Sequence, residues 1–247
     1  TIGFIKRKRH YKNRIDTFEK ITQIALKREI ASGTMKRLTP KEVLFEGGRN
    51  IMIHEPETEQ VRYYVYGRNG VEGIFMDAGN AVNLAYENAG VVVNDAGAYV
   101  WLKGSRSTKN QIMAITGEEA TEERSSLAVC LDTIFTFEGV SRNTQYMLDE
   151  GETAYSILDE NLEGCQVLDL TDCNLDTVLY YVNQDIPVLV MMEDGSAVLL
   201  IGFNEKNTVL MNPEAESGTV YKMGMNDSTE WFEQNGNRFI TYIRTNT

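Results

Sequence analysis

The chain has 247 residues, of which 42% are hydrophobic and 24% charged, and its formal net charge is −12 at pH 7. This length and composition fit a globular protein with one large core or two smaller ones. They exclude disordered and low-complexity proteins, which are poor in apolar residues or built from biased repeats. The apolar runs are short, so the sequence predicts no transmembrane helix within the chain.

The charge is distributed unevenly along the chain. Residues 1–37 contain eleven Lys or Arg and three acidic residues, a net charge of +8, so the remaining 210 residues carry −20. An acidic body of this size repels nucleic acid, and no aromatic platform accompanies the basic segment. We therefore expect no nucleic-acid partner.

The first residues support two interpretations. Ile2, Phe4 and Ile5 precede four consecutive cations at 6–9, a pattern typical of the flank of a membrane segment. On this interpretation the protein is attached to a membrane through a segment preceding Thr1, and the positive flank lies on the cytoplasmic side. The other interpretation is an ordinary solvated basic helix.

The first two predicted domains are small. Apolar residues at helical spacing predict an amphipathic helix over 11–31, which ends at Ser32-Gly33 and belongs to a leading segment, 1–38. Residues 39–117 form a predicted α+β module that binds or spaces rather than catalyses. Its predicted elements are strands 61–66 and 71–76, a helix over 78–88 capped by Asp77, and a hairpin of 91–93 with 98–101.

The third predicted domain, 118–247, begins with a helix. Its apolar stripe over 125–137 includes Cys130. The later part is mostly strand, which gives an α+β fold class for the whole chain. The elements expected after this helix are a helical segment near 142–158, strand 166–170, helix 175–183, strands 186–192, 197–203, 208–212 and 219–223, a short helix capped by Ser228, and strand 239–243.

Several segments of this domain are similar to those of the C39-like peptidase family, which has a papain-like fold. The helix at 122–131 matches the body of the family's first helix, and 194–203 resembles its Gly-His-Ala-Val-x-x-x-Gly-Tyr segment. The strand at 186–190 and the segment at 209–213 resemble its proline-led strand and its Asp-Pro strand end. The resemblance covers about residues 118–245.

The chain departs from the family at the positions that carry the chemistry. The resemblance places Glu122 at the nucleophilic cysteine, Ser196 at the general base and Asn212 at the orienting acid. A serine hydroxyl is no base near neutral pH, and a glutamate provides no thiolate. The only two histidines, His10 and His54, lie upstream of this domain. Losing the nucleophile or the base of such a unit costs about 10⁶ in rate, so we expect a pseudo-peptidase without catalytic residues.

Other sites for chemistry are less consistent with the sequence. Cys130 lies two turns into the helix on its apolar stripe, as a structural thiol would, and Cys165 and Cys173 have no histidine nearby. One disulfide is conceivable, but free buried thiols fit better. Adjacent carboxylates fit a solvated surface, and no phosphate loop or calcium-binding spacing is present. We expect neither a cofactor nor a metal.

The remaining function is binding. The resemblance implies a degenerate domain that holds a peptide or protein ligand at the bacterial cell envelope, associated with the membrane on its extracytoplasmic side. The side of the membrane stays open, because the basic flank favours the cytoplasm. Two alternatives also stay open. One is a structural or interaction module of a larger membrane-anchored protein, and the other is a hydrolase with an atypical catalytic set that depends on Glu122.

Overall fold

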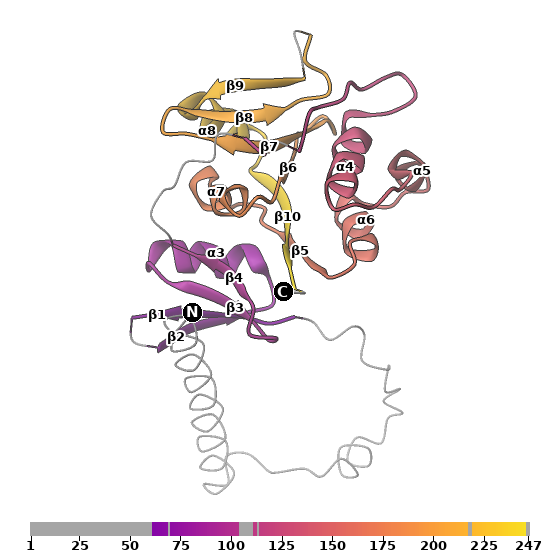
Figure 1. The fold of residues 1–247 in the computed structure, drawn as a ribbon. Coiled ribbons are helices and arrows are strands. Elements are labelled where there is room, and N and C mark those ends of the chain that lie inside the picture. Colours follow the sequence, from indigo (N-terminus) through magenta and orange to yellow (C-terminus); the bar gives the residue numbers. More distant parts are fainter. Residues whose placement is uncertain (1–60, 69, 104–110, 113, 217–218, 246–247) are drawn as a thin grey trace, which may run out of the picture. The chain divides into compact units, whose positions relative to one another are not determined.

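The computed structural model describes residues 61–68, 70–103, 111–112, 114–216 and 219–245 (Figure 1). These residues belong to one compact unit, Gln60–Thr247. The predicted leading segment, its amphipathic helix over 11–31, and both histidines lie outside the described residues.

The first part of the described chain is a four-stranded antiparallel sheet with one helix packed against it. The strand order is β2-β1-β3-β4. Asp77 caps the helix, as predicted, because its Oδ1 accepts the Asn80 N–H at 2.7 Å. The elements are β1 (Tyr63–Gly67), β2 (Gly70–Phe75), α3 (Ala78–Glu87), β3 (Val91–Asn94) and β4 (Tyr99–Leu102).

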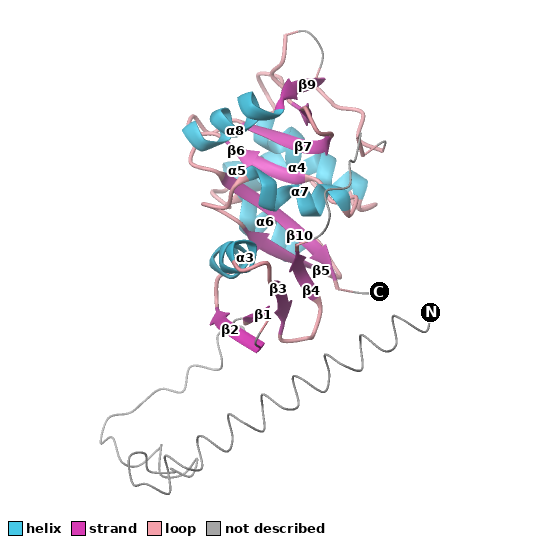
Figure 2. Ribbon diagram, turned by 90° about the vertical axis from the view of Figure 1, so that its left-hand side faces the viewer, coloured by secondary structure: helices cyan, strands magenta, loops and turns pink. Residues whose placement is uncertain are grey.

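The second part is built on a six-stranded antiparallel sheet with helices on both faces. Its strand order is β5-β10-β6-β7-β8-β9. In Figure 1, α4, α5 and α6 lie to the right of this sheet and α7 to its left, and Figure 2 shows the layers from the side. The elements are α4 (Ser126–Phe137), α5 (Thr144–Asp149), α6 (Ala154–Asn161), β5 (Cys165–Asp169), α7 (Leu175–Asn183), β6 (Val188–Met191), β7 (Ala197–Phe203), β8 (Asn207–Met211), β9 (Val220–Gly224), α8 (Met225–Gln234) and β10 (Arg238–Arg244).

The predicted α+β fold class is confirmed by these helices and antiparallel sheets, but two local predictions were wrong. The helical segment near 142–158 is two helices, because Gly151 takes a φ of +92° and Thr153 caps a new helix. Ser228 does not cap α8, which begins three residues earlier. Its buried hydroxyl instead donates to the Gly224 carbonyl at 2.9 Å.

One hydrophobic core runs through both parts of the described chain, from Tyr63 to Ile243. Polar contacts join the two sheets as well. The Gln166 amide accepts from Asn94 Nδ2 at 2.6 Å and donates to the Tyr63 hydroxyl at 2.8 Å. The Trp101 indole N–H donates to the Thr177 carbonyl at 3.0 Å. The shared core does not locate a boundary between domains, so the boundary at 117/118 remains a prediction from the sequence. Every helix in the described ranges is too short or too polar to cross a bilayer.

Candidate functional site

The start of α4 meets the start of β7. Ser125 caps α4, since its hydroxyl accepts the Ala128 N–H at 3.2 Å. The next residue, Ser126, is buried, and its hydroxyl accepts the Ala197 N–H at 3.3 Å. This contact fixes the N-terminal end of the helix against the start of β7, an inner strand of the six-stranded sheet.

The three positions singled out by the family resemblance lie in segments that meet where β7 begins and β8 ends. Glu122 is exposed in the turn between Thr121 and Arg124, Ser196 directly precedes β7, and Asn212 directly follows β8. Antiparallel pairing of Leu199 with Met211 sets the start of β7 beside the end of β8. The turn at 121–124 is held beside the end of β8, because the Ala120 N–H donates to the Pro213 carbonyl at 2.9 Å.

The side chains at these positions bond locally. The Ser196 hydroxyl donates to Asp194 Oδ1 at 2.7 Å, and Asn212 Oδ1 accepts the Glu214 N–H at 2.9 Å. The structure thus brings the three segments together where β7 begins and β8 ends. It directs Ser196 and Asn212 into their own turns.

All three thiols are free, and all are poorly placed for nucleophilic chemistry. Cys130 is buried in α4, where its Sγ donates to the Ala197 carbonyl at 3.5 Å, and burial raises its pKa well above the usual value. Burial also raises the pKa of Cys173 to about 12, and it raises the pKa of the half-buried Cys165. A reactive cysteine needs the opposite shift, toward the thiolate at neutral pH.

An open hollow of about 480 Å³ lies beside the N-terminal end of α4. It is bounded by the turn at 121–124 and by α5, and its walls are polar. The lining residues are Thr121, Glu123, Arg124, Asp132, Asn143, Gln145, Tyr146 and Asp149.

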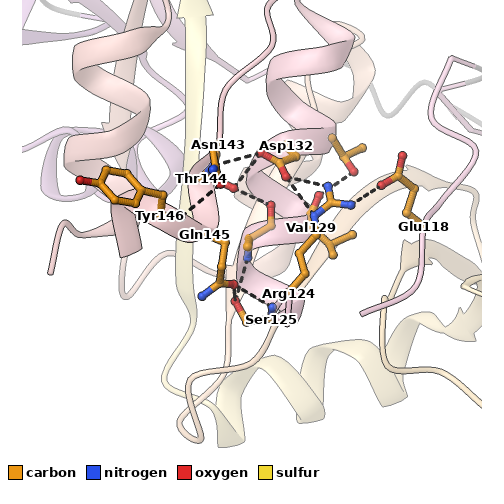
Figure 3. Close-up of polar contacts among 11 residues, drawn as sticks. Glu118, Arg124, Ser125, Val129, Asp132, Asn143, Thr144, Gln145 and Tyr146 are labelled. Carbon is orange, nitrogen blue, oxygen red and sulfur yellow. Dashed lines mark hydrogen bonds and ion pairs between the residues drawn. The ribbon is translucent and has the colours of Figure 1, made fainter. Parts of the chain in front are cut away.

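Arg124 holds the wall of this hollow together (Figure 3). Its guanidinium donates twice to Asp132 Oδ2, at 3.0 and 2.6 Å, and once to Glu118 Oε2, at 2.9 Å. Asp132 also accepts from the Thr144 hydroxyl at 2.8 Å, which ties α4 to α5. Burial alone would lower the pKa of Arg124, but the hydrogen bonds to Asp132 and Glu118 outweigh it and raise that pKa.

The rim of the hollow contains an aromatic side chain that is open to solvent. Tyr146 is 60% exposed. Its neighbour Gln145 is fixed, because Gln145 Oε1 accepts from both the backbone N–H and the hydroxyl of Ser125 at 2.9 Å. Figure 3 shows Tyr146 pointing away from this network. A rigid polar wall beside an exposed ring can take a peptide side chain with little reorganisation.

Sequence reasoning missed this hollow, although it identified the helix and strands around it. Arg124, Asp132 and Tyr146 were not singled out, because their partnership depends on α5 folding back against α4. The available signal was a charged residue, Asp132, within a strongly apolar helix. The described residues hold no group of three or more His, Cys, Asp or Glu placed to bind a metal ion.

Three solved structures that are partly similar to this chain are named as peptidases or peptidase domains. One is described as a C39-like peptidase from Bacillus anthracis, at 14% identity and a TM-score of 0.48, covering 56% of this chain and 98% of that chain. Another is the peptidase domain of Streptococcus ComA, a bifunctional ABC transporter of a quorum-sensing pathway. It is 12% identical with a TM-score of 0.36, and the match covers 52% of this chain and 96% of that chain.

The third is a double-glycine-motif protease from an AMS/PCAT transporter, solved in complex with a leader peptide. It is 16% identical with a TM-score of 0.34, and the match covers 56% of this chain and 97% of that chain. No protein-family profile and no curated protein matches the chain. At these identities and TM-scores the similarity carries no conclusion about the activity of this chain.

Proposed function

We propose that residues 118–247 form a C39-like domain that binds a peptide or a segment of a protein and does not act as a cysteine peptidase. The observation that carries this proposal is the set of side chains found where the start of α4 meets the start of β7. A cysteine peptidase needs a thiol and an imidazole side by side. In the segments that meet there, the described residues at the positions of interest are Ser126, Ser196, Asn212 and Glu122, none of which is a cysteine or a histidine.

The thiols support the absence of peptidase activity. Cys130 contacts the start of β7 from inside the core, and burial raises the pKa of its thiol, which keeps the sulfur protonated. The described residues include no histidine to accept its proton. The sulfur nearest the start of β7 therefore packs as a small apolar group.

The hollow supports binding. It is an open depression of about 480 Å³, which a side chain of a bound peptide can enter from the surface. The hydrogen-bonded wall of Arg124 and Asp132 is preorganised, and Tyr146 offers a ring with two rotatable side-chain bonds. Rigid aromatic groups of this kind contribute contact area at low entropic cost.

Binding can be tested by screening the full chain against a displayed peptide library and measuring the affinity of the selected peptides. We expect Tyr146→Ala to weaken them about tenfold, the loss of one aromatic anchor. Tyr155→Ala is the matched control, because Tyr155 is 37% exposed on α6 and does not line the hollow. Equal losses in both variants, or no selected peptide at all, would remove the hollow as the binding site.

Activity is tested separately, by incubating the same library with the full chain and searching for cleaved peptides by mass spectrometry. We expect no cleavage, and we expect iodoacetamide to leave Cys130 and Cys173 unmodified in the folded protein. Cleavage abolished by Cys130→Ser would overturn the pseudo-peptidase proposal. Cleavage abolished by Glu122→Gln would instead support a hydrolase with an atypical catalytic set.

We also propose that the protein acts at the cell envelope, in association with the membrane on its extracytoplasmic side. This proposal depends on the family resemblance. Fractionation of cells that produce the protein, followed by protease treatment of intact cells, tests it. Recovery in the soluble cytosolic fraction would contradict the proposal.

A further inference from the structure

The residues that line the hollow beside α4 are charged unequally. Four of them have ionisable side chains: Glu123, Arg124, Asp132 and Asp149. Three carboxylates and one guanidinium sum to a net charge of −2. Asp132 is already the partner of Arg124, with which it forms two hydrogen bonds. The uncompensated charge of the hollow therefore belongs to Glu123 and Asp149.

Arg124 is not free to hold an acidic ligand. Its guanidinium donates to Asp132 on one side and to Glu118 on the other (Figure 3). An incoming carboxylate would have to displace one of these acceptors and would then lie beside the remaining ones. Carboxylates placed this close repel one another. The hollow therefore disfavours acidic side chains.

The other two carboxylates are open to a cation. Both Glu123 and Asp149 are exposed, and no Lys or Arg among the described residues forms an ion pair with either. Asp149 Oδ1 accepts from Gln145 Nε2 at 2.8 Å, a neutral donor that orients the carboxylate and leaves its charge unbalanced. The exposed ring of Tyr146 lines the same hollow, and the face of an aromatic ring attracts cations.

We propose that the hollow recognises a basic side chain, Lys or Arg, of the bound peptide. Glu123 and Asp149 are its counter-charges, and Tyr146 provides the aromatic surface against which its stem and cation pack. An apolar side chain would gain less, because the walls are mostly polar. This inference rests on the function proposed above, in which the hollow binds a peptide, and it specifies the chemistry of that peptide.

The test uses the full chain and two displayed random-peptide libraries, one containing all amino acids and one without Lys and Arg. We expect the complete library to yield peptides that share a basic residue at one position. In synthetic copies with blocked termini, citrulline in place of Arg, or acetyl-lysine in place of Lys, removes the charge and keeps the length of the side chain. This change should weaken binding about tenfold or more.

Variants of the protein locate the contact. Glu123→Gln and Asp149→Asn should each weaken the selected peptides about threefold, the effect of losing one partly solvated ion pair. Glu205→Gln is the matched control. It removes the same charge from an exposed residue in the turn between β7 and β8, at the far end of β7 from its contact with Ser126. It should leave the affinity unchanged, and all three variants should keep the parent melting temperature.

The outcomes separate this inference from the function on which it rests. Peptides from the library without Lys and Arg that lose affinity in Tyr146→Ala would overturn the preference for a basic side chain and support peptide binding by the hollow. Equal weakening by Glu123→Gln and Glu205→Gln would assign the preference to the general charge of an acidic protein, which also overturns the inference. A failure of both libraries to yield any peptide would overturn the proposed function itself.

Discussion

Asp132 has the densest set of polar contacts near the hollow. Its carboxylate accepts from Arg124 and Thr144, and the side chain is 19% exposed. Removing it takes away two hydrogen bonds of the partly buried Arg124 guanidinium, which keeps only Glu118, and one acceptor of the buried Thr144 hydroxyl, which keeps the Ala128 carbonyl. Groups in this situation are expensive, because their hydrogen bonds to water were lost on folding.

We therefore expect Asp132→Ala to lower the free energy of unfolding by about 1–2 kcal/mol, measured by urea denaturation. The estimate is moderate because Arg124 is one-third exposed and can regain water. Asp149→Ala, at an exposed residue that also lines the hollow, should change stability by less than about 0.5 kcal/mol. Equal effects would mean that the Arg124 contact contributes little.

Glu138 makes the free energy of unfolding depend on pH. Burial on its own raises the pKa of this carboxyl, but hydrogen bonds from Arg244 and Tyr242 outweigh burial and leave the pKa below its ordinary value. A depressed folded-state pKa adds stability above the unfolded-state pKa, near 4.5. That stability is lost as the pH falls through the lower pKa of the folded protein.

Glu138→Gln should accordingly be less stable than the parent protein near neutral pH, and the difference should shrink as the pH falls below 4.5. Denaturant unfolding across this range measures the difference. A gap that stays constant with pH would indicate that Glu138 contributes by packing rather than by charge. Tyr242→Phe, which removes one of the two donors, should produce a smaller change in the same direction.

At the scale of elements, the segment before α4 is fastened to the large sheet at successive points. The Ile112 N–H donates to the Ile201 carbonyl at 2.7 Å, and Gly117 lies against Thr219. Gly117 has a φ of +83°, and a Cβ there would come within 2.3 Å of the Thr219 hydroxyl. Glycine is therefore required here both for its backbone conformation and for the close approach.

We expect Gly117→Ala to destabilise the protein by about 2 kcal/mol or more, combining backbone strain with a steric clash. Gly139→Ala is the matched control, because Gly139 has a φ of +77° and nothing within 4 Å of the added carbon. The control isolates the backbone cost, about 1 kcal/mol. Thermal unfolding of the two variants compares them, and equal losses would exclude the contact with Thr219.

Local patterns explain which elements could be predicted from the sequence. The helices α3, α4 and α7 have apolar stripes and capping side chains, β7 is an apolar run, and β8 ends in one, so these were recognised. The start of α8 was not, because Gly224 gives no side-chain cap. The hollow could not be predicted, because Asp132 contacts Thr144 of α5 only after tertiary folding.

At the scale of the whole molecule, the two sheets share one core, and the seam between them contains buried side chains. Trp101 inserts between α3 and α7, with its ring near Tyr86 and Tyr180. Elements that share a core and hydrogen bonds of this kind unfold together. We therefore expect the described part of the chain to unfold in one transition.

The two tryptophans allow this to be measured, because Trp101 lies in β4 and Trp231 in α8. Trp231→Phe leaves fluorescence from the first sheet alone, and Trp101→Phe leaves fluorescence from the second part. Within each variant, the denaturation midpoint by fluorescence should coincide with that by far-ultraviolet circular dichroism. Separate midpoints would support two independent domains divided at 117/118.

The position of β10 has a consequence for synthesis of the protein. This strand, at residues 238–244, pairs with β5 on one side and β6 on the other. During translation, an edge of β6 must therefore stay unpaired until about fifty further residues have been made, and β5 must wait for about seventy, which is several seconds at about 5–20 residues per second. Unpaired strand edges are templates for aggregation. The nascent chain is thus most vulnerable just before β10 leaves the ribosome, which is when chaperones that shield exposed strands would have most effect.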